Sequence, residues 1–209
     1  RDRLPMETAA NFRTATLGRT GLRVGRLGVA ASYGVPASAV ERAFEEGVNY
    51  FYWGSRRTPA FAEGLRHLAP HRDRLVVVVQ SYSRVARLVG WSIERALQSL
   101  HFDHADVLLL GFWNGEMSES ILDAARRVKD RGLVKHLGIS THTRRRVPRL
   151  ASGSDFDVVH LRYNAAHPGA EQDIFPFVPQ SDRAGLVAFT ATSWGQLLGK
   201  GPFFRPSRL

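Results

Sequence analysis

The sequence predicts an α/β fold in which short parallel strands alternate with helices in a single domain. Seven short apolar segments recur along the 209 residues, and amphipathic segments of helical periodicity lie between them. The expected strands cover residues 27–32, 49–53, 75–80, 106–112, 135–140, 157–163 and 186–192. Two of them, VVVVQ and DVLLLGF, are continuously apolar, as is typical of parallel strands covered on both faces.

Helix boundaries are indicated by cap residues between these strands. Ser38 and Glu41 have the S-x-x-E spacing of a capping box, and Gly47 is expected to end the helix that they begin. Ser120 and Gly132 are expected to begin and end the helix after the fourth strand. The helix after the third strand has an apolar stripe made of Val85, Leu88, Val89, Ile93, Ala96, Leu97 and Leu100.

Periodicity leaves two arrangements open, because an open doubly wound sheet and a closed barrel both alternate parallel strands with helices. The G-x-G-x-x-G fingerprint, which would favour an open dinucleotide-binding sheet, is absent, since the first strand leads into ASYGVPAS. Residues 12–25, with apolar residues around a Gly-containing turn, are expected to form a β-hairpin before the first strand.

Composition narrows the class of function. The chain has no cysteine and no apolar run long enough for a signal peptide or a membrane span, so we expect a cytoplasmic protein without membrane insertion. The eight histidines show no H-x-H or H-E-x-x-H spacing, and no metal site is expected. The net charge of +10 is almost all arginine; it permits a nucleic-acid contact, but a solvated basic surface is the preferred interpretation.

Seven segments of the chain resemble the aldo-keto reductases, which are NADPH-dependent (β/α)8 barrels preceded by a β-hairpin. They are LGRTGLRVGRLGVA, AFEEGVNYFYWGS, DRLVVVVQS, DHADVLLLGFW, DRGLVKHLGIS, DVVHLRYN and GLVAFTATSWGQLLGK, in family order and at family spacing. The resemblance implies that residues 1–209 form one barrel of the (β/α)8 TIM-barrel type, with about seven of the eight strands present.

The eighth βα unit of the family is expected to be absent. The sequence is then a fragment of a longer protein, or a partner chain fills the gap, or the tail folds over it. Unpaired edges at the first and seventh strands would allow a protein partner or self-association.

The resemblance also locates four catalytic residues of the family, none of which is kept here. The aspartate falls on Tyr52, the tyrosine on Arg57, the lysine on Gln80 and the histidine on Gly111. In the family the tyrosine protonates the carbonyl oxygen while carbon receives hydride. Loss of one member of a buried ion pair costs about 3–5 kcal/mol, whereas two neutral replacements avoid this cost. Tyr52 and Gln80 are therefore expected to hydrogen-bond in place of the pair.

The cofactor site implied by the resemblance is partly kept. The family binds the nicotinamide carboxamide through a Ser-Asn pair and a glutamine, and stacks the ring on an aromatic residue. The corresponding residues here are Ser140 with Thr141, His160, and Phe189 followed by Thr190. Phe189 still offers a π face. Thr141 is shorter than asparagine and a neutral His160 offers one acceptor, so the implied NADP site has weakened carboxamide recognition.

Further candidates lie where strands end at the C-terminal face of such a barrel. Tyr82, just after Gln80, is the first candidate for a replacement proton donor; the alternative is that its ring packs beneath a loop. His142 has an intrinsic pKa suited to proton transfer near neutrality. Arg56 and Arg57 could bind an anion, or be an exposed loop pair.

Two functions follow from these observations. The first is an NADP-dependent oxidoreductase that moves hydride between the cofactor and a small carbonyl or alcohol substrate, with a non-standard proton donor such as Tyr82. The alternative is a non-catalytic barrel, a pseudoenzyme that binds a small ligand, a nucleotide or a protein partner. The retained stacking residue favours the first, and the replaced catalytic residues favour the second.

Overall fold

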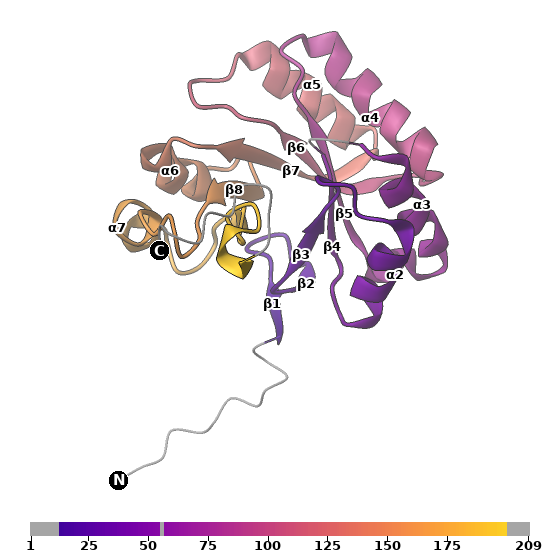
Figure 1. The fold of residues 1–209 in the computed structure, drawn as a ribbon. Coiled ribbons are helices and arrows are strands. Elements are labelled where there is room, and N and C mark those ends of the chain that lie inside the picture. The colour runs from indigo at the N-terminus through magenta and orange to yellow at the C-terminus, as the bar shows by residue number, and fades with distance from the viewer. Residues whose placement is uncertain (1–12, 55–56, 200–209) are drawn as a thin grey trace.

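The computed structural model describes residues 13–54 and 57–199, which form a two-stranded and a seven-stranded sheet (Figure 1). The expected hairpin is confirmed, because β1 (Thr14–Thr16) pairs antiparallel with β2 (Arg23–Gly25). The larger sheet is parallel throughout and runs in chain order, as β3 (Gly28–Ala30), β4 (Tyr50–Trp53), β5 (Val76–Ser81), β6 (Ala105–Leu110), β7 (Val134–Thr141), β8 (Val158–Arg162) and β9 (Gly185–Phe189).

The seven expected strands are confirmed, but four of them, β3, β6, β8 and β9, end one to three residues earlier than predicted. β6 ends at Leu110 rather than Phe112, and β9 ends at Phe189 rather than at residue 192. Phe112 and Thr190 have φ angles of 24° and 55°, so the chain leaves the extended conformation at both positions.

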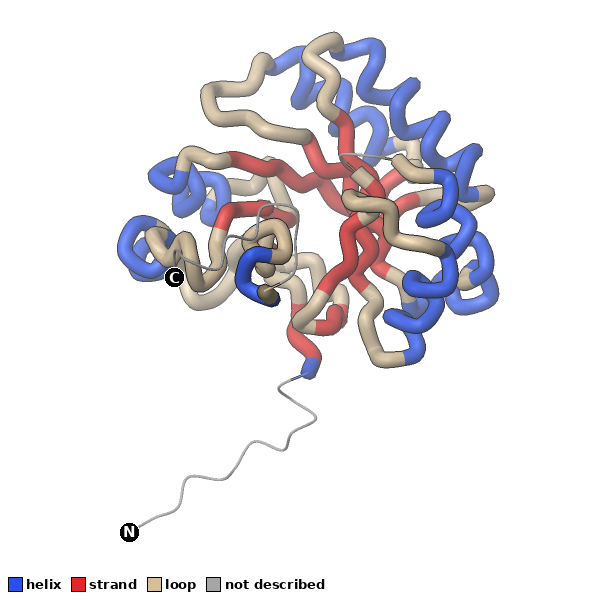
Figure 2. The backbone as a smooth tube through the Cα atoms, viewed as in Figure 1, coloured by secondary structure: helices blue, strands red, loops and turns tan. Residues whose placement is uncertain are grey.

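Helices cover the outer face of the curled sheet (Figures 1 and 2). The α-helices are α2 (Ala37–Glu45), α3 (Pro59–His67), α4 (Ala86–Leu100), α5 (Glu119–Asp130), α6 (Val147–Ser152) and α7 (Ala170–Asp173). Short 3-10 segments are η1 (Ala69–Arg74), η2 (Arg144–Arg146), η3 (Phe175–Phe177) and η4 (Gln196–Leu198). None of the helices in the described part of the chain is both long and apolar enough to cross a membrane.

The predicted cap serines are wrong, whereas the predicted helix ends are confirmed. Pro36 precedes α2 in extended conformation, so Ser38 already lies in the first helical turn and makes no capping bond. Ser120 likewise lies inside α5, which follows Ser118. Gly47 and Gly132, with φ of 91° and 75°, follow the ends of α2 and α5 in the left-handed conformation that glycine accepts most readily.

Side chains of the parallel strands alternate between two cores, because successive residues point to opposite faces. The larger core lies between the sheet and the helices; it includes Phe51, Val77, Val79, Leu108, Leu110, Ile93, Leu100, Ile121 and Ala125. The smaller core lies on the concave side, where Tyr50, Val76, Val78, Val107, Leu109 and Val158 pack against Leu17 and Val24 of the hairpin region. In α4 the predicted stripe is buried except for Val85 and Leu88, which are exposed.

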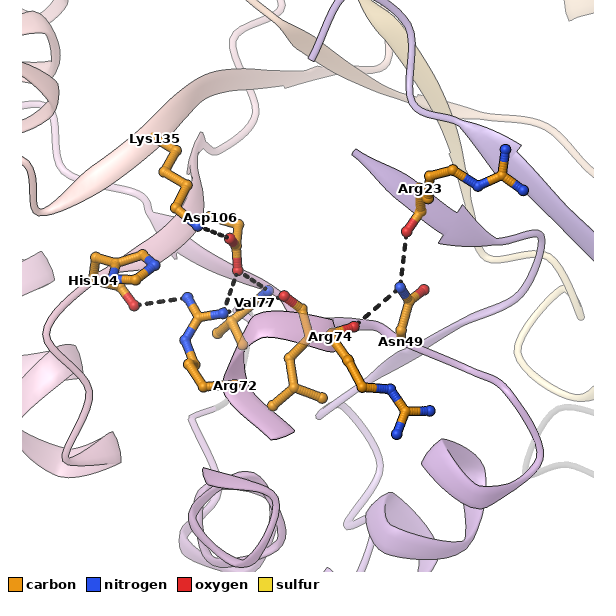
Figure 3. A network of polar contacts seen from close by, with 9 residues as sticks. Arg23, Asn49, Arg72, Arg74, Val77, His104, Asp106 and Lys135 are labelled. Atoms are coloured by element: carbon orange, nitrogen blue, oxygen red, sulfur yellow. Dashed lines mark hydrogen bonds and ion pairs between the residues drawn. The ribbon is translucent and has the colours of Figure 1, made fainter. Parts of the chain in front are cut away.

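Polar contacts fix the N-terminal ends of the strands (Figure 3). Asp106, buried at the start of β6, accepts the backbone N–H of Val77 at 2.8 Å and forms ion pairs with Arg72 at 2.8 Å and Lys135 at 3.2 Å. Asn49 donates to the carbonyl oxygen atoms of residues 23 and 74 and accepts the N–H of residue 25. This end of a barrel contributes stability, whereas chemistry lies at the opposite end.

The seven parallel strands form a curled half-barrel, part of a (β/α)8 barrel (Figure 1). β3 and β9 are the end strands of the sheet, and no described strand joins them. The hairpin segment reaches across this side, because Gly18 forms an antiparallel bridge with Ala184 and the N–H of Arg19 donates to the carbonyl oxygen of Arg183 at 2.8 Å.

Candidate functional site

A cavity of about 1600 Å³ lies on the concave side of the sheet and extends to the hairpin. Seven of the candidate residues from the sequence line it: Tyr52, Gln80, Ser140, His142, His160, Phe189 and Thr190. Thr141 and Tyr82 are not among the lining residues. Residues 55 and 56, which include the candidate Arg56, lie outside the described part of the chain.

Gln80 lies buried in the cavity wall at the end of β5. Neither its side-chain oxygen nor its nitrogen has a hydrogen-bond partner, so the expected bond between Tyr52 and Gln80 is not formed. A Cβ atom at Gly111 would lie 2.0 Å from Nε2 of Gln80, which means that the amide occupies the space above this glycine. Any larger residue at position 111 would displace it. Gln80 thus offers the cavity one acceptor and one donor group.

His160 and Tyr50 form a buried pair in the cavity wall. The hydroxyl of Tyr50 and Nε2 of His160 share a hydrogen bond of 2.7 Å between β4 and β8. Burial lowers the pKa of His160 to about 3, so the imidazole is neutral near pH 7. Burial, with a smaller contribution from Tyr52, raises the pKa of Tyr50. His160 therefore presents an uncharged ring to the cavity, its Nε2 already engaged.

Tyr52 shares the concave face of β4 with Tyr50, two residues away. Its ring centroid lies 5.9 Å from that of His160. A Cβ atom at Gly54 would lie 2.2 Å from the hydroxyl oxygen of Tyr52, so the side chain extends along the backbone toward the end of the strand. The sequence places Tyr52 at the family's aspartate, and the structure places it in the cavity.

Arg57, at the family's tyrosine position, holds the loop after β4 to its neighbours. Nη2 donates to the carbonyl oxygen of Gln80 at 2.7 Å and to the hydroxyl of Ser92 at 3.0 Å. The guanidinium carbon lies 5.7 Å from the centre of the Trp53 ring. Burial lowers the pKa of Arg57, with nearby Tyr52 acting in the opposite direction. The alternative of an exposed loop residue is wrong for Arg57, whose side chain stabilises the cavity wall.

Ser140 and Thr141 differ in what they can offer a ligand. Ser140 is buried at the end of β7, where its hydroxyl accepts the N–H of Phe112 at 3.2 Å and retains its own proton for donation. Thr141 donates to Oδ1 of Asn114 at 3.3 Å and accepts the N–H of Thr143 at 3.1 Å. Ser140 faces the cavity, while Thr141 holds the adjoining loop.

Aromatic rings surround the open end of the cavity. The Phe112 ring stacks on His142 with centroids 4.8 Å apart and lies 6.1 Å from the Phe189 ring. The Tyr82 ring packs against the Phe112 ring with centroids 5.6 Å apart, and Tyr82 is 40% exposed. Tyr82 thus contacts the cluster from outside the cavity lining, and its role as proton donor stays a prediction.

Further cavity-lining side chains come from the end of β8 and the last described loop. Nη2 of Arg162 lies 2.8 Å from Nε2 of His167, and its guanidinium carbon lies 5.1 Å from the centre of the Trp194 ring. Thr190 bonds to its own strand, since its hydroxyl donates to the carbonyl oxygen of Phe189 at 2.7 Å. Arg162 and Trp194 line the cavity together with Thr190.

Sequence reasoning missed Tyr50, Phe112 and Arg162 as site residues. Tyr50 and Arg162 could have been found from strand alternation, because each lies two residues from a predicted site residue, Tyr52 or His160, and so shares its face. Phe112 depends on a positive φ angle that no local pattern signals. In residues 13–54 and 57–199, no group of three His, Asp or Glu side chains could hold a metal ion.

The seven parallel strands, the helices outside them and the cavity on the concave side define the class of protein as a (β/α)-barrel. The chain belongs to the aldo/keto reductase family: the sequence model of that family matches residues 37–203. A comparison with curated protein sequences gives no match.

Solved structures agree with this assignment. An aldo/keto reductase from Klebsiella pneumoniae in complex with NADP and acetate has a TM-score of 0.75 at 19% identity, covering 89% of this chain and 70% of the other. The aldo-keto reductase PA4992 of Pseudomonas aeruginosa gives 0.70 at 20% identity over 84% and 77% of the two chains. AKR11C1 from Bacillus halodurans, in its holo form, gives 0.62 at 16% identity over 73% and 58%. At identities of 16–20%, these TM-scores show that the chains share a fold.

Proposed function

We propose that this chain is a nicotinamide-dependent oxidoreductase that moves hydride between NADP(H) and a small carbonyl or alcohol substrate. The observation that carries the proposal is that one cavity joins three residues at the family's nicotinamide positions, Ser140, His160 and Phe189, to two polar groups of the floor, Tyr52 and Gln80. The NADP found in the Klebsiella pneumoniae structure supports the choice of cofactor.

The lining residues fit a nicotinamide in part. Phe189 offers a ring for stacking, and Ser140 a hydroxyl donor for the carboxamide. The Nε2 atom of His160 is engaged by Tyr50, and Thr141 is engaged by its loop, so fewer groups are free for the carboxamide than in the family pattern. When bound, the cofactor supplies the hydride.

Gln80 is suited to hold the substrate carbonyl. Its unpartnered Nε2 group lies buried in the cavity wall, where a donated hydrogen bond to a carbonyl oxygen would satisfy a group that is costly to leave unpaired. Amide donors of this kind stabilise negative charge that develops on oxygen during reduction. Gln80 therefore positions the carbonyl group of the substrate.

Two tyrosines compete for the role of proton donor. Tyr52 is supported by its place in the cavity beside His160, and Tyr82 by its position just after Gln80 at the open end. A proton donor is required because reduction leaves an alkoxide oxygen that must gain a proton.

The test is NADPH oxidation with a panel of small aldehydes and ketones, using the wild-type chain and the variants Tyr52→Phe and Tyr82→Phe. We expect loss of the proton donor to lower kcat about 100-fold or more, whereas the other variant stays near wild type. Ser99→Ala on the outer face of α4 is the control for nonspecific effects. Cofactor binding without turnover of any carbonyl compound would contradict the oxidoreductase proposal and favour the non-catalytic barrel.

A cytoplasmic location also remains a proposal, which rests on the cysteine-free composition.

A further inference from the structure

Arg162 is a cation on the inner face of the barrel at the C-terminal end of β8. It lies two residues after His160, so both side chains point to the same side of the strand, and both line the cavity. Two residues of a parallel strand span about 6.6 Å, which places Arg162 one level closer to the open end.

The contacts of this guanidinium are with neutral groups. Nη2 contacts Nε2 of His167, and the Trp194 ring lies beneath its plane. Nε is buried without a hydrogen-bond partner. Within residues 13–54 and 57–199, no Asp or Glu forms an ion pair with Arg162. A buried guanidinium N–H without an acceptor carries a desolvation cost that an oxyanion would remove.

Other arginines at this end of the barrel are already engaged. Arg144 forms an ion pair with Asp173 at 2.6 Å, and Arg146 donates to the carbonyl oxygen of Trp113 at 2.7 Å. Arg57 binds the carbonyl oxygen of Gln80. The remaining cavity arginines 19, 26 and 183 lie at the hairpin end, where Arg19 and Arg183 donate to carbonyl oxygen atoms.

The charge of Arg162 affects the pKa of two neighbouring histidines. Burial, and then the charge of Arg162, lower the pKa of both His142 and His167 below 6.5. The lowered pKa values favour the neutral form of both rings. The positive potential at this corner of the cavity comes from Arg162.

We propose that Arg162 is an anion-binding residue of the cavity, which takes the paired oxygen atoms of a carboxylate or phosphate group on the bound ligand. A guanidinium presents donors in a planar fork that matches such oxygens, and Trp194 holds the plane in place. The inference deepens the proposed function, on which the identity of the ligand rests: the anion is either the carboxylate of an oxo-acid substrate or a phosphate of the cofactor.

The test uses matched probes and direct binding. Calorimetry measures binding to the wild-type chain and to Arg162→Gln. The three ligands, measured separately, are 4-carboxybenzaldehyde, its uncharged methyl ester and NADPH. Arg162→Lys keeps the charge but loses the fork, and we expect it to recover only part of the affinity. Arg127→Gln on the exposed face of α5 removes the same charge away from the cavity. Circular dichroism and thermal unfolding establish that each variant is folded.

The outcomes separate the two sources of the anion. If the substrate supplies it, Arg162→Gln weakens binding of the carboxylate probe about tenfold or more and leaves the ester and NADPH unchanged. If the cofactor supplies it, the same variant weakens NADPH by a similar factor. Equal affinities of wild type and Arg162→Gln for all three probes would overturn the proposal. Carboxylate binding that depends on Arg162 in a chain that does not bind NADPH would sustain this inference while removing the proposed function.

Discussion

Gln80, on β5, and Gly111, directly after β6, occupy the positions of the family's lysine and histidine, and each requires the other. The amide of Gln80 fills the space that a side chain at position 111 would need. A lysine-to-glutamine change alone would leave this amide in conflict with a histidine, and a glycine alone would leave a void. The floor of the cavity is therefore rebuilt as a unit around an uncharged amide.

The variant Gly111→Ala tests this dependence. Its Cβ would lie 2.0 Å from Nε2 of Gln80 and 2.7 Å from a ring carbon of Tyr82, and we expect a loss of about 1–3 kcal/mol in the free energy of unfolding. Urea unfolding measures the loss. The double variant Gln80→Ala with Gly111→Ala should be more stable than the sum of the single changes predicts; simple additivity would show that the two residues are independent.

His160 makes stability depend on pH. Its pKa is lowered by burial from 6.5 in the unfolded chain to about 3 in the folded one, so between these values the unfolded chain binds more protons. Stability is then fully present above about pH 6.5 and falls as the pH is lowered toward 3. In His160→Gln this part of the decline should be missing from unfolding curves measured across the same range. An unchanged pH profile would contradict a buried, neutral His160.

The candidate site could be predicted from sequence only where the strands fix the position of a side chain. Tyr52, Gln80, Ser140, His160 and Phe189 were assigned from the resemblance to the aldo-keto reductases; all five lie on strands, and all five line the cavity. Arg57 was misjudged because its hydrogen bonds to Gln80 and Ser92 join segments distant in the sequence. Partners of this kind depend on tertiary packing, which local patterns do not show.

At the scale of elements, β6 is anchored at its start by Asp106. This carboxylate holds the N–H of Val77 on β5, Arg72 of η1 and Lys135 of β7, so one side chain connects three elements (Figure 3). The sequence offered only an aspartate before an apolar run, and its role was not predicted.

Asp106→Asn is expected to lower the free energy of unfolding by about 3 kcal/mol, because two cations lose their counter-charge at a buried position. Chemical denaturation measures the difference. Asp123→Asn is the matched control, since its ion pair with Arg126 is half-exposed and should contribute less than about 1 kcal/mol. Equal effects of the two substitutions would contradict a special role for Asp106.

At the scale of the whole molecule, the seven strands were predictable because the alternation of apolar strands and amphipathic helices repeats along the chain. The choice of a barrel over an open sheet was not available from periodicity, since curvature is a property of all strands together. Helix starts were also misplaced, because Ser38 and Ser120 satisfy a local capping rule that the chain does not use.

The open side of the half-barrel leads to a prediction about association. We propose that the chain self-associates through the outer edges of β3 and β9, which no strand of residues 13–54 and 57–199 pairs, because exposed edge strands present free backbone donors and acceptors. Light scattering coupled to gel filtration should then show species larger than a monomer that increase with concentration. Ala188→Lys, a charge on the exposed edge of β9, should shift the population to monomer, whereas Gln98→Lys on α4 should not. A chain that is monomeric at all concentrations would contradict this proposal.

Fluorescence titration with NADPH tests whether the cavity binds a nicotinamide cofactor. We predict saturable binding to the folded chain, weakened several-fold by Phe189→Ala, which removes the stacking ring. The matched variant Phe177→Ala, at an exposed ring outside the cavity, should bind NADPH as the wild type does. Absence of binding at millimolar NADPH, with the chain folded, would contradict the account.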